Sequence, residues 1–159
     1  MSIRLATAAD IPTLRTLYAE RHAERLAEWG AELDIDALRA AWEAGVLHVY
    51  VVELGGIIRG ALVWARHEGA GWQWITAWWR SAYTGNQIKQ RGAEAVRDLA
   101  SRVPPETPVW GNAPTGTFWA KFFDAAAERM GGWQIRRRIA ADGREWATYR
   151  TTAGNMAGL

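Results

Sequence analysis

The sequence contains no cysteine, which excludes disulfide bonds, thiolate nucleophiles and cysteine-ligated metals. It also lacks a long apolar run: Met1 to Arg4 does not begin a signal peptide, and no stretch approaches the length of a membrane span. Neither sign of charge dominates, because 19 basic residues stand against 17 acidic ones. We therefore expect a protein without membrane contact that stays in the cytoplasm, or in a particle assembled there.

The length of the chain fits one domain. With 159 residues it can bury roughly two-thirds of the surface of its unfolded form. Hydrophobic residues make up 49% and charged residues 23%, which is typical of globular proteins. We expect one domain over residues 2–151. Residues 152–159 are small and polar, so we expect them to form a C-terminal tail.

Hydrophobic periodicity and turn residues predict an α/β domain. Its order is one strand, two helices, three strands, a helix, a strand, a helix and two strands. Gly55-Gly56 and Asp142-Gly143 are typical of hairpin turns, and Gly111 to Thr117 is expected to be a polar loop. The predicted strands cover residues 3–6, 46–54, 57–66, 72–79, 109–110, 133–139 and 145–151. We expect them to form a mixed, mostly antiparallel sheet of six or seven strands, with about four helices on its faces.

This element order resembles that of the GNAT acetyltransferase superfamily over residues 2–150, as does the opening Ile3-Arg4-Leu5-Ala6-Thr7-Ala8-Ala9-Asp10. The resemblance implies a sheet that splays between its fourth and fifth strands. It also implies an acyl-CoA pyrophosphate bound by the loop before the third helix, where free N–H groups converge. If acyl-CoA binds, the resemblance assigns its contacts to Thr84, Gly85, Asn86, Gln87, Ile88, Lys89 and Asn112.

Several residues depart from the family pattern. The loop arginine is replaced by Thr84, and two loop glycines are replaced by Gln87 and Lys89, whose Cβ atoms would keep a phosphate from the backbone amides. Phe123 stands where many of these enzymes have a tyrosine that protonates the leaving thiolate, and phenylalanine has no ionisable proton. We therefore expect no catalytic residue and no bound cofactor, with acetyl-CoA expected only if the chain is an active acyltransferase.

General-base candidates in and beside the strands are ordinary polar residues. Glu53 is interpreted as a solvated hairpin residue, and His67 and Glu68 as turn residues. His48 is a lone strand histidine, a type that is more often structural than catalytic. No group of histidine and acidic residues has metal-ligand spacing, so we expect no metal site.

Tryptophan is abundant, with 11 residues in the chain. Trp72, Trp74, Trp78 and Trp79 fall in one predicted strand and cannot all face one core, because successive strand residues point to opposite faces. Either both sheet faces are covered, or these rings form an interface with a protein partner. Arg136 to Arg138 place two cations on one strand face, which we interpret as a solvated face rather than a nucleic-acid site.

A second resemblance, over residues 83–135, is to small GNAT-like proteins of short-tailed phages; it includes Val109-Trp110-Gly111-Asn112 and the aromatic helix that follows. It supports the hypothesis of a GNAT-fold protein with a degraded acyl-CoA site that acts non-catalytically through protein contacts, as a virion or assembly component. The alternative is an acetyl-CoA-dependent N-acyltransferase with an atypical pyrophosphate loop. Under the first hypothesis the cleft beside the fourth strand is closed by side chains such as Trp79, Tyr83 and Trp110, or by a protein segment.

Overall fold

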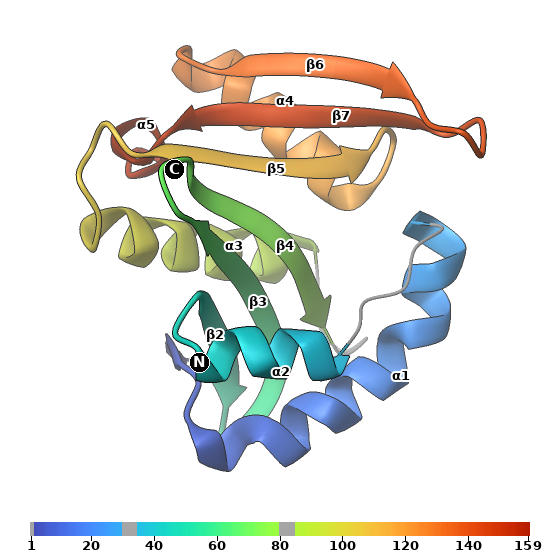
Figure 1. Ribbon diagram of the computed structural model, residues 1–159, viewed down its shortest axis with the longest axis vertical. Helices are drawn as coiled ribbons and strands as arrows, with labels where there is room; N and C mark the ends of the chain where they lie inside the picture. Colours follow the sequence, from blue (N-terminus) through green and yellow to red (C-terminus); the bar gives the residue numbers. More distant parts are fainter. Residues whose placement is uncertain (1, 30–34, 80–84) are drawn as a thin grey trace.

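The chain folds around a seven-stranded sheet with helices on both faces (Figure 1). The computed structural model describes residues 2–29, 35–79 and 85–159, without the side chains of residues 22–25, 27–29, 35, 78, 79 and 88. Its elements are β1 (Ser2–Leu5), η1 (Ala8–Asp10), α1 (Ile11–Trp29), α2 (Ile35–Glu43), β2 (Leu47–Leu54), β3 (Ile57–His67), β4 (Gly71–Trp79), α3 (Gly85–Ser101), β5 (Pro108–Pro114), α4 (Phe118–Met130), β6 (Gln134–Ile139), β7 (Glu145–Thr152) and α5 (Ala153–Met156). The predicted element order and the α/β class are confirmed.

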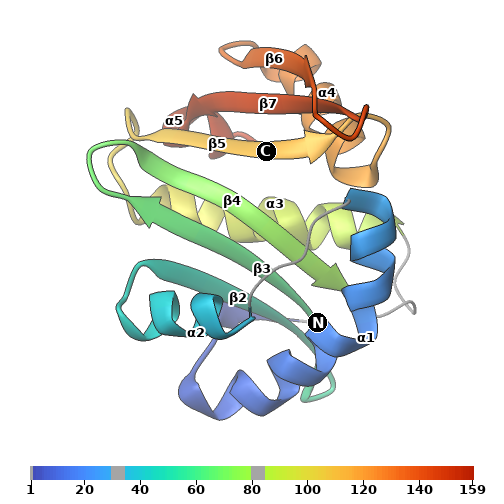
Figure 2. The same cartoon turned by 45° about the vertical axis from the view of Figure 1, so that its right-hand side comes forward.

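The sheet is mixed and mostly antiparallel, as predicted. Its strand order is β1-β2-β3-β4-β5-β7-β6, and β4 with β5 is its one parallel pair. That pair is short, since Trp72 to Trp74 lie opposite Val109 to Gly111 and the remainder of β4 has no register with β5. Beyond this contact the two strands diverge (Figure 2). The predicted splay between the fourth and fifth strands is therefore present.

Two hydrophobic cores lie on the two faces of the sheet. Strand alternation sends Val49, Val51 and Val63 to the core beneath α1 and α2. It sends Tyr50 and Trp64 to the larger core beneath α3 and α4. No described helix is both long enough and apolar enough to cross a membrane.

Two predicted boundaries near the C-terminus are wrong. β5 continues through Gly111 to Pro114, because its pairing with β7 extends over seven residues where a loop was expected. The expected tail is part of the domain: β7 reaches Thr152, and α5 follows directly. Ala153 and Met156 are buried in the larger core, and the Ala153 N–H donates to the Thr107 carbonyl at 2.9 Å.

Polar side chains of the opening motif join β1, η1 and β2 by ion pairs and hydrogen bonds. Arg4 donates to both carboxylate oxygens of Asp10, at 2.8 and 2.9 Å, and to Glu53 on β2 at 2.6 Å. Asp10 also accepts from the backbone N–H and the hydroxyl of Thr7. Glu53 is therefore half-buried in an ion pair, and its expected role as a solvated hairpin residue is wrong.

We predict that Asp10→Asn lowers the free energy of unfolding by about 1–3 kcal/mol at neutral pH. Hydrogen bonds from Arg4 hold the pKa of Asp10 far below its ordinary value of 3.8. The stabilisation is therefore complete above that value and is lost as the pH falls below it. Urea unfolding should show the difference from wild type shrinking in acid, whereas the exposed Glu106→Gln control should match wild type throughout. A difference that persists unchanged into strong acid would contradict the role of the Asp10 charge.

We also predict that Gly71→Ala opens the contact between β4 and β5 and costs about 3 kcal/mol or more. Gly71 has a φ of +107°, and a Cβ there would overlap the carbonyl oxygen of Pro108 and lie 2.9 Å from its carbonyl carbon. Gly69→Ala is the matched control, because Gly69 also has a positive φ but no atom within 4 Å of a new Cβ. It should cost about 1–2 kcal/mol. Equal losses in urea unfolding would show that the Pro108 contact is unimportant.

Candidate functional site

The splay leaves one edge of β4 without a strand partner. Past Trp74, β4 pairs with β3 on one side, and none of the described strands is in register with it on the β5 side. Unpaired backbone groups along such an edge can hydrogen-bond to an extended ligand. Such an edge could hold an extended chain of amides.

A β-bulge lies at the point where β4 leaves β5. Trp64 pairs with Trp74 and Val63 pairs with Thr76, so Ile75 is the extra residue. The Thr76 side chain is fully buried, and its hydroxyl has no hydrogen-bond partner among the described residues. A buried hydroxyl without a partner is costly and therefore notable. No pattern in the sequence predicts a role for Thr76, because residue order does not reveal whether a hydroxyl is buried without a partner.

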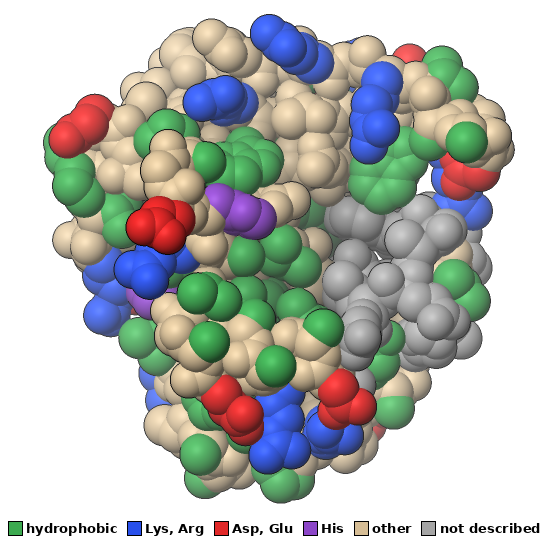
Figure 3. Space-filling model, in the orientation of Figure 1, with side chains coloured by type: hydrophobic (Ala, Val, Ile, Leu, Met, Phe, Trp, Pro, Cys, Tyr) green, Lys and Arg blue, Asp and Glu red, His purple; other side chains and the backbone are tan. Residues whose placement is uncertain are grey.

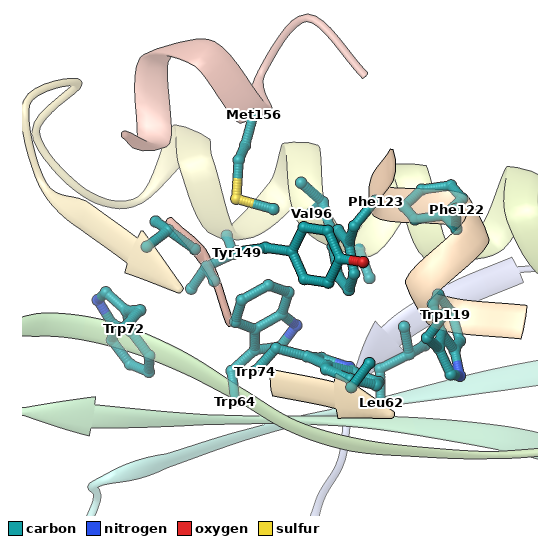
Figure 4. Packing of buried hydrophobic residues seen from close by; sticks show 14 of the residues in the cluster. Leu62, Trp64, Trp72, Trp74, Val96, Trp119, Phe122, Phe123, Tyr149 and Met156 are labelled. Atoms are coloured by element: carbon teal, nitrogen blue, oxygen red, sulfur yellow. The ribbon is translucent and has the colours of Figure 1, made fainter. Parts of the chain in front are cut away.

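An indole ring fills the space between α3, α4 and β4 beside the splay. Trp119, in the first turn of α4, has its ring centroid 5.2 Å from that of Trp74. It also lies against α3 at Gly92, where a Cβ would come within 3.2 Å of its Cη2 atom. Figure 4 shows Trp119 below the α4 ribbon, in the same core cluster as Leu62. Only 8% of Trp119 is exposed, so this space is occupied by the protein itself.

Phe123 belongs to the same aromatic cluster. Its ring is 5.6 Å from that of Trp74 and 5.3 Å from that of Tyr149, and its side chain is buried. The Tyr149 hydroxyl does not replace the missing tyrosine, because it donates to Asp124 and to the Ala120 carbonyl, at 3.0 and 3.2 Å. Burial, assisted by the Asp124 charge, raises the pKa of Tyr149 well above its ordinary value. These contacts make Tyr149 a structural hydrogen-bond donor.

The predicted loop residues lie at the start of α3. Thr84 falls outside the described residues, Gly85 is the first residue of the helix, and the side chain of Ile88 is not described. Asn86, Gln87 and Lys89 are exposed on the first turns. The Lys89 Nζ lies 6.0 Å from the centre of the Phe118 ring of α4, so the Lys89 cation sits over an aromatic ring.

Asn112 does not join these residues. It lies on β5 between Gly111 and Ala113, which are both buried, and its own side chain turns to the opposite face of the sheet. There its Oδ1 accepts a hydrogen bond of 2.6 Å from the Thr148 hydroxyl. The predicted CoA-binding set is therefore divided between the two faces of the sheet.

The predicted general-base candidates either pack against aromatic rings or are exposed in a turn. His48 stacks against Trp72 with centroids 4.4 Å apart, and burial lowers its pKa. The neighbouring Tyr50 hydroxyl is buried without a hydrogen bond of normal geometry, and burial followed by the Asp98 charge raises its pKa. The His67 ring lies against the ring of Trp110 on β5, and Glu68 is exposed in the β3–β4 turn. No cluster of metal-ligand side chains occurs in the described part of the chain.

The expected aromatic interface on β4 is wrong for two of its four residues. Trp72 and Trp74 are 6% and 2% exposed and lie in the larger core. They are two residues apart, so both point to the same face of the sheet, which α3 and α4 cover. The side chains of Trp78 and Trp79 are outside the described residues, and their role stays a prediction.

Comparisons with known proteins identify the fold. No family model and no curated protein sequence matches the chain. Its structure resembles the ribosomal-protein-alanine N-acetyltransferase of Brucella melitensis, with a TM-score of 0.67 and 19% identity over 96% of this chain and 99% of that one. An aminoglycoside 6'-acetyltransferase type Ii gives a TM-score of 0.71 and 13% identity, covering 96% and 97%.

A third similar structure contains a ligand. It is a protein from Salmonella typhimurium classed as a candidate acetyltransferase and solved with acetyl-CoA, with a TM-score of 0.70 and 15% identity over 96% of this chain and 93% of that one. Identities this low show the fold and no more. The chain has the GNAT fold that the sequence predicted.

We predict that Trp119 and Gly92 are energetically coupled. Trp119→Ala should cost about 3–5 kcal/mol, because it removes a buried ring. Once the ring is gone, Gly92→Ala should stabilise α3 by about 1 kcal/mol through helix propensity. In the wild-type background the new Cβ presses on the indole, so the same change should be neutral or destabilising. Urea unfolding of the double-mutant cycle measures the coupling, and additive effects would contradict this contact.

Proposed function

We propose that this chain is a GNAT-fold protein with a degraded acyl-CoA site, and that it acts non-catalytically through contacts with a protein partner. The observation that carries the proposal is Trp119, which is packed between Trp74 and Gly92 beside the free edge of β4. Phe123 supports it, because a buried hydrocarbon ring replaces the acid that would protonate a leaving thiolate.

A ligand in the splay would have to move Trp119. The buried ring contributes about 3 kcal/mol or more to stability, so its displacement would weaken binding by about a hundredfold or more. The phosphates of the ligand would make few favourable contacts at the start of α3 to offset this cost. Gln87 and Lys89 carry side chains where the family has bare backbone, and Lys89 lies over the ring of Phe118.

The non-catalytic role would be in an assembly. The resemblance of residues 83–135 to small phage proteins points to a virion component, made in the cytoplasm and held by protein contacts. Trp78 and Trp79 stay candidate anchors for that partner. Under this proposal the fold is kept for its surface, since a fold and its chemistry are separable.

The second candidate is an acetyl-CoA-dependent N-acyltransferase, favoured by the free edge of β4. The bulge at Ile75 and the unpaired hydroxyl of Thr76 lie at that edge. The Salmonella protein of the same fold binds acetyl-CoA. Other similar structures transfer acetyl groups to a ribosomal-protein alanine or to an aminoglycoside. The acceptor here would thus be a primary amine, with water carrying the proton to the leaving thiolate.

Acetyl-CoA binding separates the two candidates. At a hundredfold excess over its dissociation constant, a bound ligand stabilises the folded state by about 2.7 kcal/mol. We predict no change in the melting temperature of the wild-type protein with acetyl-CoA, measured against ATP as a control for general phosphate binding. Calorimetry should likewise show no heat of binding. A rise specific to acetyl-CoA, with acetyl transfer to an amine, would overturn the non-catalytic proposal.

A further inference from the structure

The three C-terminal strands have one covered face and one open face. α4 lies behind β5, β7 and β6 in the view of Figure 1, and none of the described helices crosses in front of them. α1 contacts β5 only at the edge of this face, where Pro114 is buried. The strand registers give three cross-strand rows on the uncovered side, which we call the open face. The rows are Gln134–Arg150–Trp110, Arg136–Thr148–Asn112 and Arg138–Trp146–Pro114.

The open face is positively charged. Arg136, Arg138 and Arg150 are exposed, and no ion pair joins them to a carboxylate in the part of the chain that the structure describes. No acidic residue occupies any of the nine positions. Figure 3 shows this side of the molecule, with basic side chains over the three strands. Arg137 differs, because it points to the other face and pairs with Asp124 at 3.2 Å.

Each tryptophan of the open face lies directly opposite an arginine. Trp110 on β5 is opposite Arg150 on β7, and Trp146 on β7 is opposite Arg138 on β6. Both rings are half-buried, so part of each meets solvent. The Trp110–Arg150 pair and the Trp146–Arg138 pair lie four residues apart along the strands, or about 13 Å. His67 extends the first pair, with its ring 5.2 Å from that of Trp110.

We propose that the open face binds single-stranded nucleic acid. Arginines without acidic neighbours attract phosphates, and flat rings on a sheet surface stack with unpaired bases. A duplex keeps its bases stacked on one another, so they would not be available to stack on the tryptophans. An acidic peptide would pair with the arginines but offer no flat partner to the rings. The sequence alone favoured a solvated face, because it did not reveal that Arg150 and both tryptophans join Arg136 and Arg138.

This surface is independent of the acyl-CoA cleft, since Trp119 and Phe123 lie on the other side of the same strands. Binding can be measured by fluorescence polarisation with a labelled single-stranded oligonucleotide of about 12 nucleotides. The double variant Arg136→Gln/Arg138→Gln should bind more weakly and reduce the slope of log affinity against log salt by about 1.4. Arg137→Gln is the matched control, because it removes the same type of charge from the same strand, and its affinity should stay near wild type.

Base stacking is tested with Trp110→Leu, which keeps an apolar side chain but removes the ring. Its affinity should fall about fivefold or more, with unfolding by urea confirming that the variant is folded. Four results would overturn the proposal: no binding at low salt, equal losses in the Arg137→Gln control, tighter binding of a duplex of the same sequence, or preference for a polyglutamate peptide. Single-strand binding lost in the open-face variants and kept in the control would support it.

Discussion

The close contact of Gly71 with Pro108 holds β4 and β5 together at one end, and the arrangement of the rest depends on it. A residue with a Cβ would not fit against the Pro108 carbonyl, so only glycine allows the strands to meet there. The parallel pairing then lasts for three residues before the strands separate. Gly111 serves the same contact, because it admits the Trp74 side chain against β5. β4 and β5 are thus paired at one end and separated at the other.

An opening in a sheet leaves backbone groups that need hydrogen-bond partners and apolar surface that needs other side chains to cover it. Here the neighbouring space contains aromatic side chains of α4, with Trp119 in contact with both α3 and β4. The same rings that stabilise the junction of the helices would therefore oppose a ligand. Under the non-catalytic proposal, the packing that stabilises the fold and the lack of an ionisable proton at Phe123 would both oppose acyl transfer.

The C-terminal strands show how alternation divides roles between two faces. Tyr149 and Ala147 of β7 are buried under α4, while Trp146 and Arg150 of the same strand face the open side. Arg137 and Arg138 separate in the same way, one into an ion pair and one onto the open face. A core and a solvent-facing surface can therefore be built from adjacent residues without interfering with each other.

The element order and the hairpin turns at Gly55-Gly56 and Asp142-Gly143 could be predicted from the sequence, because they follow from local periodicity and turn geometry. The lack of an acid at Phe123 is likewise a matter of residue chemistry. Which faces of the sheet are covered cannot be predicted in this way: the sequence makes Trp74 a candidate interface residue, whereas the structure places it in the core. The contact of Trp119 with Gly92 and the alignment of Arg150 with Trp110 were decided by the tertiary structure. Both join residues far apart in the chain, and helix packing and strand register, which bring such residues together, leave no local pattern in a sequence.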